Sequence, residues 1–399
     1  MTIRLSERLR RLPAYPLAEI PSIKRRLIES GVDVIDLGAG DNDTPPPADV
    51  VREMNAALAD PAMSKYGFQQ GYAGFRRAAS DYVARRFGHR FDAATEILPL
   101  IGSKEGLAHL PFAFVDPGEV VILPEPGYQA YIGGAILAGA EPYVYPLAAA
   151  NGFLLELDWV PAAILDRPRL VYLNYPNNPT AAVAPLEYLA RTVAICRARG
   201  IVLAYDNAYC DLVFDDYRAP SIFDVPGARD VAVELFSLSK SFSMTGWRIG
   251  FAAGSKDLIG ALAKVKTYTD TGPFLAIQRA GVVAHDRAEE FVAPIKAELG
   301  RRRDAGVAAL RAIGLAVESP KAAMYLWVPL PAEVPSGPFS RQALERHGVV
   351  TLPGSAFGPA GEGYFRIALT VGADRLTEAA GRLGQALETF EPWRVSAAS

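Results

Sequence analysis

A lysine in the middle of the chain stands where chemistry on a small molecule is expected. The segment Ser237-Leu-Ser239-Lys240 follows an apolar run at residues 231–237 that has the composition of a buried strand. Open α/β sheets bind their ligands at the carboxyl ends of their strands, so Lys240 is expected at a binding site. Hydroxyls of Ser237 and Ser239 and the guanidinium of Arg248 are suitable donors to a phosphate. Lys240 is therefore a candidate for an amine that condenses with an aldehyde.

A second candidate phosphate site comes earlier in the chain. Gly102-Ser103-Lys104 stands between an apolar run at residues 96–101 and a helical stretch that begins KEGLAHL. A strand, a glycine turn and a helix start bring free backbone N–H groups and the positive end of the helix dipole to one point, which suits an anion. The spacing G-x-x-x-x-G-K-[ST] of nucleotide-binding loops is missing here.

Two polar motifs follow other apolar runs. Asp206-Asn-Ala-Tyr209 ends the run IVLAYD, and Asn178-Pro-Thr comes shortly after the run LVYLN. In isolation the first motif is typical of a helix cap with a packed aromatic, and the second of a turn. Their places after buried strands put them at the same expected sheet edge as Lys240.

Together these motifs resemble the class I/II aminotransferases of fold type I, which use pyridoxal 5'-phosphate (PLP). The resemblance runs over roughly residues 34–370, in the family's order, and is closest to the branch of LL-diaminopimelate and bacterial alanine aminotransferases. It implies that Lys240 holds PLP as a Schiff base and moves a proton at the substrate Cα. It also implies ping-pong transfer of an amino group from an L-amino acid to a 2-oxo acid. LL-diaminopimelate, alanine or a similar donor and the glutamate/2-oxoglutarate pair are the expected substrates.

The resemblance gives the remaining cofactor-binding residues their roles. Asp206 pairs with the protonated pyridine nitrogen, while Tyr209 and Asn178 hydrogen-bond the phenolic oxygen of the ring. Tyr128, in Glu125-Pro-Gly-Tyr128, stacks on the ring. The phosphate is assigned to Ser103, Lys104, Ser237, Ser239 and Arg248.

Substrate binding and subunit assembly also follow from the resemblance. Arg366 grips the substrate α-carboxylate, for which its planar fork is suited, and Gly40 and Asn178 lie at the same site. Tyr66 reaches the phosphate of the neighbouring subunit's cofactor, which implies a homodimer with shared active sites. The family usually has glycine after the threonine of the Asn178 motif. This chain has Ala181, a departure that is common in the branch named above.

Positioning these residues requires a sheet whose strands mostly run in parallel. Short apolar runs alternate with amphipathic stretches such as residues 185–199, which indicates an α/β fold with helices on both faces of the sheet. From about residue 289 a long charged helix, two short strands and a last helix indicate a smaller α+β domain. We expect an N-terminal arm with part of the small domain at 1–45, a PLP-binding domain at 46–288 and a small C-terminal domain at 289–399.

The composition narrows the partners and the compartment. The 399 residues carry 41 basic and 44 acidic side chains, a net charge of −3 that gives no attraction to nucleic acid or an anionic membrane. No apolar run approaches the ~18 residues that span a bilayer. Cys196 and Cys210 are too few for a disulfide framework, so the cytoplasm is the expected location. The four histidines lack metal-ligand spacing, and no metal is expected.

Two alternatives stay open at this point. A β-lyase or racemase can use the same cofactor motifs, because the reaction depends on which Cα bond stands perpendicular to the cofactor ring. A PLP-binding regulator would carry an added DNA-binding domain, for which the N-terminal arm is too small.

Overall fold

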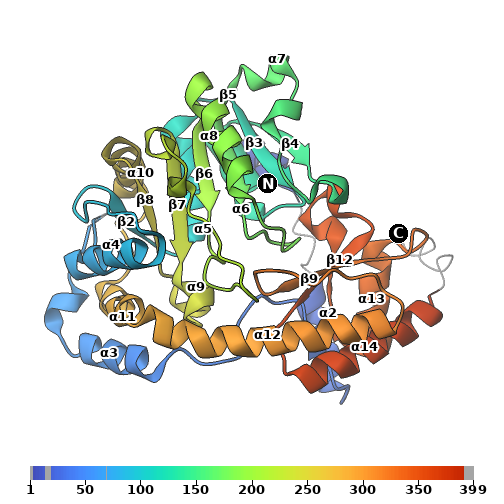
Figure 1. The fold of residues 1–399 in the computed structure, drawn as a ribbon. Helices are drawn as coiled ribbons and strands as arrows, with labels where there is room; N and C mark the ends of the chain where they lie inside the picture. Colours follow the sequence, from blue (N-terminus) through green and yellow to red (C-terminus); the bar gives the residue numbers. More distant parts are fainter. Residues whose placement is uncertain (1–2, 14–18, 69, 391–399) are drawn as a thin grey trace.

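The computed structural model describes residues 3–13, 19–68 and 70–390, and its largest element is a seven-stranded sheet (Figure 1). The strand order is β2-β8-β7-β6-β5-β3-β4. β8 runs antiparallel to both of its neighbours, β2 and β7, and the other adjacent strands pair in parallel. The predicted, mostly parallel sheet is confirmed. The strands are β2 (Ile97–Leu100), β3 (Val120–Glu125), β4 (Glu141–Pro146), β5 (Pro168–Asn174), β6 (Val202–Asp206), β7 (Ala232–Ser237) and β8 (Gly250–Gly254).

Helices cover both faces of this sheet, so its strands are apolar at consecutive positions. In β5, Leu170 and Tyr172 pack towards α5 (Ser103–Phe114), α6 (Gln129–Ala138) and α10 (Lys256–Thr269). Val171 and Leu173 pack in a second cluster with α4 (Ala73–Phe87), α8 (Leu186–Arg199) and α11 (Leu275–Asp286). Burial on both sides is the usual condition of a parallel sheet.

The edge strand β4 was missed by sequence reasoning. Its sequence, EPYVYP, has a proline near each end and is exposed or half-buried at five of its six positions. Proline lacks the N–H that a central strand needs and is tolerated at sheet edges. The prolines hid a strand that has only one neighbour, β3.

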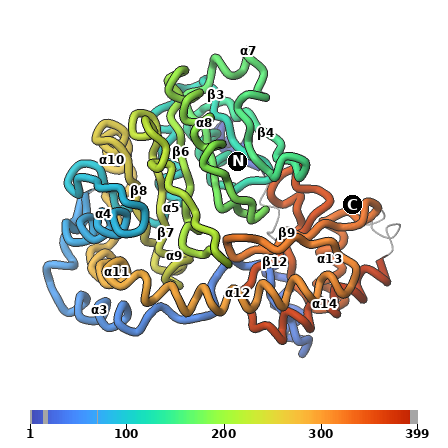
Figure 2. The backbone as a smooth tube through the Cα atoms, viewed as in Figure 1, coloured from blue at the N-terminus to red at the C-terminus, as the bar shows by residue number. Residues whose placement is uncertain are grey.

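A second layer of structure is built from both ends of the chain. Strands β11 (Leu352–Pro353), β12 (Tyr364–Ala368) and β9 (Tyr325–Pro329) form an antiparallel sheet, and β1 (Ile35–Asp36) pairs in parallel with β10 (Val349–Val350). The helices around them are α12 (Ala288–Ala312), α13 (Ser336–His347) and α14 (Ala373–Glu388). Figures 1 and 2 show α12 running from beneath the large sheet to this second core.

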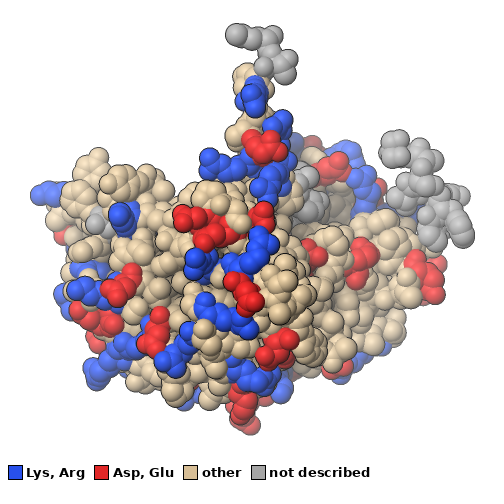
Figure 3. Space-filling model, turned by 90° about the horizontal axis from the view of Figure 1, so that it is seen from above, with Lys and Arg blue, Asp and Glu red and all other residues tan. Residues whose placement is uncertain are grey.

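The remaining helices are short or lie at the periphery. Their bounds are α1 (Glu7–Arg11), α2 (Ile20–Glu29), α3 (Ala48–Leu58), α7 (Ala162–Leu165) and α9 (Leu238–Ser241). Within the described ranges, no helix is both long enough and apolar enough to cross a membrane. On the face shown in Figure 3, basic and acidic side chains are interspersed.

Candidate active site

A cavity of about 570 Å³ lies where the carboxyl ends of the parallel strands meet the second sheet. Strand β6 ends there with Asp206, and β7 ends there with Ser237. Every site residue expected from the sequence lines this cavity except Tyr66. The lining includes Gly40, Ser103, Lys104, Tyr128, Asn178, Asp206, Tyr209, Ser237, Ser239, Lys240, Arg248 and Arg366.

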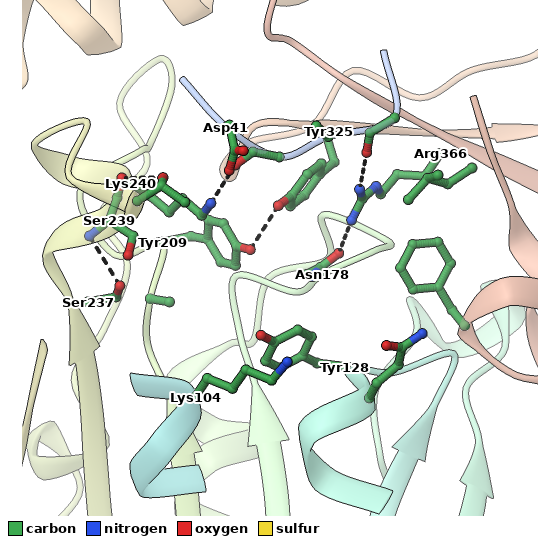
Figure 4. Close-up of a pocket in the computed structure, with 18 of the residues that line it drawn as sticks. Asp41, Lys104, Tyr128, Asn178, Tyr209, Ser237, Ser239, Lys240, Tyr325 and Arg366 are labelled. Carbon is green, nitrogen blue, oxygen red and sulfur yellow. Dashed lines mark hydrogen bonds between the residues drawn. The ribbon is translucent and has the colours of Figure 1, made fainter. Parts of the chain in front are cut away.

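Lys240 lies on α9, the single helical turn that follows β7. Ser237 caps this turn, because its hydroxyl accepts a hydrogen bond from the Ser239 N–H at 3.2 Å. The side chain of Asn42 donates to the Lys240 carbonyl at 3.0 Å, which ties the turn to the N-terminal segment. The Lys240 ammonium points into the cavity and donates to the carbonyl of Gly40 (Figure 4). The backbone of Lys240 is therefore fixed while its amine reaches the open space.

Asp206 provides a test of whether the cavity fits PLP. Its carboxylate is 4% exposed, and one oxygen, Oδ2, accepts a hydrogen bond from Tyr131 at 2.8 Å. The other, Oδ1, is buried without a partner among the described residues. Burial raises the pKa of Asp206 to about 6, against the opposing effect of the Tyr131 hydrogen bond. Since an unpartnered buried carboxylate oxygen is costly, a protonated ring nitrogen is a fitting ligand for it.

Asn178 lies on the opposite side of the cavity from the Ser237 end, and Tyr209 lies between them, beside Lys240 (Figure 4). Burial, followed by the neighbouring Tyr325, raises the pKa of the Tyr209 phenol well above its usual range, so this hydroxyl keeps its proton. Asn178 is held by its own backbone, whose N–H donates to the Asn174 side chain at 2.7 Å. Asn174 in turn donates to the Asp206 carbonyl at 2.8 Å, which locks the two strand ends together.

The opposite end of the cavity is suited to a phosphate. The twelve-residue helix α5 begins there at Ser103, and Ser237, Ser239 and Arg248 line the same cavity. A Cβ on Gly102 would lie 2.4 Å from Nη2 of Arg248, and the φ of Gly102 is 69°. The positive φ favours glycine here, and the guanidinium of Arg248 lies close to its backbone. Hydroxyls, a guanidinium and a helix N-terminus together make an anion site.

Lys104 and Tyr128 line the wall between these two ends. The Lys104 ammonium lies 5.7 Å from the centre of the Tyr128 ring, a cation–π distance. The Tyr128 ring meets that of Tyr131 edge to face, at 5.8 Å and 83°. Tyr128 thus presents an aromatic surface next to the residue that binds Asp206.

Arg366 is a buried cation without an acidic partner in the part of the chain that the structure describes. Its Nη1 donates to the Asn178 side chain and its Nη2 to the Gly38 carbonyl, both at 2.7 Å. Nε is buried and has no hydrogen-bond partner among the residues described. Burial of an unpaired charge is expensive, so the site favours an anionic ligand such as a carboxylate.

Tyr66 is placed apart from this cavity. Its side chain is 80% exposed and stacks on Phe68 at 5.9 Å. It cannot serve the cavity of its own chain in this position.

Three functional side chains were missed by sequence reasoning. Tyr131 lies one helical turn after Tyr128, and Asn174 pairs with Asp206 in the sheet register, so spacing held a signal for both. Tyr325 had no such signal. Its hydroxyl lies 2.9 Å from that of Tyr209, although 116 residues separate them in the chain.

A cluster between α5 and the end of α10 has the residue types of a metal site. Oxygen and nitrogen atoms of Glu105, His109 and Asp270 lie within 4.8 Å of one another. The fully buried ammonium of Lys266 is 2.6 Å from Glu105 and 2.9 Å from Asp270. A cation of the protein itself already satisfies these carboxylates.

The fold and the cavity define a PLP-dependent enzyme of the fold type I class. The model of the family "Aminotransferase class I and II" matches residues 32–383, and the chain belongs to this family. The protein uses PLP as its cofactor and transfers an amino group between an amino acid and a 2-oxo acid. The expectation of an aminotransferase is thus confirmed over the alternatives of other PLP chemistry and of a regulator.

Similar proteins span nearly the whole chain. An LL-diaminopimelate aminotransferase of Aquifex aeolicus is 45% identical over 95% of this chain and 98% of its own length. One of Desulforudis audaxviator is 44% identical over 95% and 96%. Among solved structures, a probable N-succinyldiaminopimelate aminotransferase of Thermus thermophilus is 37% identical, covers 93% of this chain and all of its own, and has a TM-score of 0.89.

Proposed function

We propose that this aminotransferase takes LL-diaminopimelate as its amino donor and 2-oxoglutarate as its acceptor. The observation that carries the proposal is the 45% identity, over almost the full length, to an enzyme named for that donor. The cavity supports it, because its wall has charged and polar groups beyond those expected to bind PLP. They include Lys24, Asp36, Asp41 and Gln129. Lys24 and Asp36 form an ion pair at 2.6 Å, which would have to open before they could bind the amino and carboxylate groups at the far end of this substrate.

In this proposal Arg366 binds the α-carboxylate of the substrate, with Asn178 and the Gly38–Gly40 backbone beside it. PLP, when bound, supplies an aldehyde and an electron-accepting ring. Asp206 holds a proton on the ring nitrogen through its free oxygen Oδ1, and Tyr209 donates to the phenolic oxygen. Lys240 anchors the cofactor and, once displaced by the substrate amine, takes the proton from Cα.

The remaining contacts hold the cofactor in place. Tyr128 would stack on the ring. The start of α5 and the side chains of Lys104, Ser103, Ser237, Ser239 and Arg248, which line the same cavity, would hold the phosphate end. The two half-reactions take place one after the other at the same site, so the kinetics are expected to be ping-pong.

Donor competition tests the substrate. LL-diaminopimelate, N-succinyl-LL-diaminopimelate, alanine and aspartate would be compared as donors to 2-oxoglutarate by kcat/KM. We expect LL-diaminopimelate to lead by at least tenfold and double-reciprocal lines to be parallel. A lead for alanine would refute this donor, and intersecting lines would refute the two-step scheme. Lys240→Ala is expected to abolish formation of the pyridoxamine form from any donor, and full turnover by this variant would refute its role.

The active enzyme is also proposed to be a cytoplasmic homodimer in which Tyr66 completes the partner's site. Tyr66 and Phe68 are 80% and 61% exposed, and Phe274 is 42% exposed. The segments that carry them pack together, because a Cβ on Gly67 would lie 2.3 Å from Leu275. Large exposed aromatics in one region are typical of an interface.

Mixing two inactive variants tests the shared site. Lys240→Ala and Tyr66→Ala homodimers are each expected to be impaired, since every site lacks one group. A heterodimer of the two has one site with both residues intact, so mixing after partial unfolding and refolding is expected to restore activity. No recovery in a proven heterodimer would show that Tyr66 acts within its own chain.

A further inference from the structure

Tyr325 lies at the junction of the two sheets, with its hydroxyl in the cavity (Figure 4). It begins β9, whose partner strand β12 carries Arg366. The side chain is 2% exposed. Its hydroxyl oxygen lies 2.9 Å from that of Tyr209, and the two rings meet nearly at right angles, at 74°.

Two further groups contact the same side chain. The Arg366 guanidinium carbon lies 4.2 Å from the centre of the Tyr325 ring. In the sheet register Arg366 pairs with Trp327 and Ala368 pairs with Tyr325, so Arg366 and Tyr325 are diagonal neighbours on one face. A Cβ on Gly40 would lie 2.5 Å from the Tyr325 hydroxyl oxygen. Tyr325 therefore packs between the carboxylate site and the Gly40 carbonyl that accepts from Lys240.

The direction of the hydrogen bond between the two phenols follows from their proton count. Each hydroxyl has one proton to donate and lone pairs to accept with. If Tyr209 donates to the phenolic oxygen of PLP, it has no second proton for Tyr325. Tyr325 must then be the donor and Tyr209 the acceptor.

We propose that Tyr325 is a positioning residue that directs the Tyr209 proton towards the cofactor and strengthens the hydrogen bond that Tyr209 donates. The inference rests on the proposed role of Tyr209. A hydroxyl that accepts one hydrogen bond becomes a better donor in the next, because the chain of bonds polarises cooperatively. Tyr325, which lies on the three-stranded sheet, thereby affects the cofactor ring bound at the edge of the seven-stranded sheet. The same ring supports Arg366, so substrate carboxylate binding and cofactor tuning share one side chain.

The pH titration of the visible absorption band of the holoenzyme measures this effect. The group that titrates is the nitrogen that links Lys240 to the cofactor. A hydrogen-bond donor to the phenolic oxygen stabilises the negative charge there most when this nitrogen has lost its proton. The donor therefore lowers the midpoint of the titration. Tyr325→Phe removes the hydroxyl and keeps the ring. We expect its midpoint to rise by ~0.1–0.7 pH unit, because cooperativity strengthens a hydrogen bond to a charged oxygen by about 10–30%. Tyr209→Phe should raise it further.

The double variant distinguishes positioning from a separate contribution. If Tyr325 acts through Tyr209, Tyr209→Phe/Tyr325→Phe has the midpoint of Tyr209→Phe alone. Additive shifts would overturn the inference, and so would an unchanged midpoint in Tyr325→Phe when Tyr209→Phe shifts. If Tyr209→Phe itself leaves the midpoint unchanged, the proposed role of Tyr209 fails and takes this inference with it.

A matched control and a kinetic readout exclude a merely structural effect. Tyr364 lies on the adjacent strand β12 and stacks on Trp327 at 5.1 Å. Tyr364→Phe makes the same chemical change in the same sheet and should leave the midpoint at the wild-type value. Tyr325→Phe should lower kcat severalfold with KM for the donor within about twofold, because the ring beneath Arg366 remains. A large KM increase with an unchanged midpoint would indicate that Tyr325 serves Arg366 alone.

Discussion

Replacement of Gly40 by alanine should be harmful only while Tyr325 has its hydroxyl. A Cβ at residue 40 would lie 2.5 Å from Oη of Tyr325 but 3.3 Å from its Cε1 and Cζ. Tyr325 must shift by about half an ångström or more to restore an ordinary contact of roughly 3 Å or longer. That shift lengthens its 2.9 Å hydrogen bond to Tyr209.

The expected cost has two parts. Overpacking a tight site by one methyl group costs about 1–3 kcal/mol. Loss of the hydrogen bond between the phenols adds ~0.5–1.5 kcal/mol. Gly40→Ala should therefore lower the free energy of unfolding by about 1.5–4.5 kcal/mol in the wild-type background. In a Tyr325→Phe background the hydroxyl is gone, and the same change should cost less than ~1 kcal/mol.

Urea unfolding of the four proteins, wild type, both single variants and the double variant, measures this difference. Gly246→Ala is the matched control, because a Cβ there meets nothing within 4 Å although the residue lies close to the same cavity. Its effect should be small in either background. An equal cost of Gly40→Ala in both backgrounds would refute the reasoning.

Three further perturbations follow from the buried charges. Asp206→Asn removes the carboxylate that would hold a proton on the cofactor ring nitrogen. Breaking a buried ion pair costs ~3–5 kcal/mol, so kcat should fall roughly 150- to 5,000-fold. Near-normal turnover would count against this role of Asp206. Arg366→Lys removes the planar guanidinium that can bind a carboxylate through two hydrogen bonds. KM should rise about 30-fold or more for both the amino donor and the 2-oxo acid, because the same site binds both. A rise for only one of the two substrates would contradict this. Burial raises the pKa of Glu234 to about 8 from 4.5. The folded wild type therefore loses stability as pH rises from about 4.5 to about 8, whereas Glu234→Gln does not titrate. The free energy of unfolding of Glu234→Gln, measured with urea, should therefore rise relative to that of the wild type between pH 5 and pH 8. A difference between the two proteins that does not change with pH would refute the raised pKa of Glu234.

Much of the cofactor end of the site was predictable because each residue follows a strand. Lys240, Asp206 and Asn178 come directly or shortly after apolar runs, and parallel strands end at one edge. This reasoning places the three side chains at one sheet edge, whereas their roles towards the cofactor came from the family resemblance. The strand β4 escaped the same reasoning, because two prolines and a half-exposed edge position hide its pattern.

The substrate end could be placed only by resemblance. Arg366 reaches Asn178 across 188 residues, and that contact depends on how the second sheet packs against the first. Periodicity within a segment carries no such information. Tyr325 shows the limit most clearly, because its role depends on a single hydroxyl in a sheet of ordinary apolar composition. Tyr131 is intermediate, since its spacing from Tyr128 was visible but its bond to Asp206 was not.

The pairing of β1 with β10 has a consequence for the newly made chain. The seven strands that carry the cofactor end lie between residues 97 and 254, so all of them are made while the last 145 of the 399 residues are still to come. The segment that holds Ile35 and Gly38 leaves the ribosome first, yet its partners Val349 and Arg366 are among the last to emerge. Once α11 has covered the sheet, the protein can therefore form the cofactor end of its cavity during synthesis while it still lacks the residues that bind an amino acid.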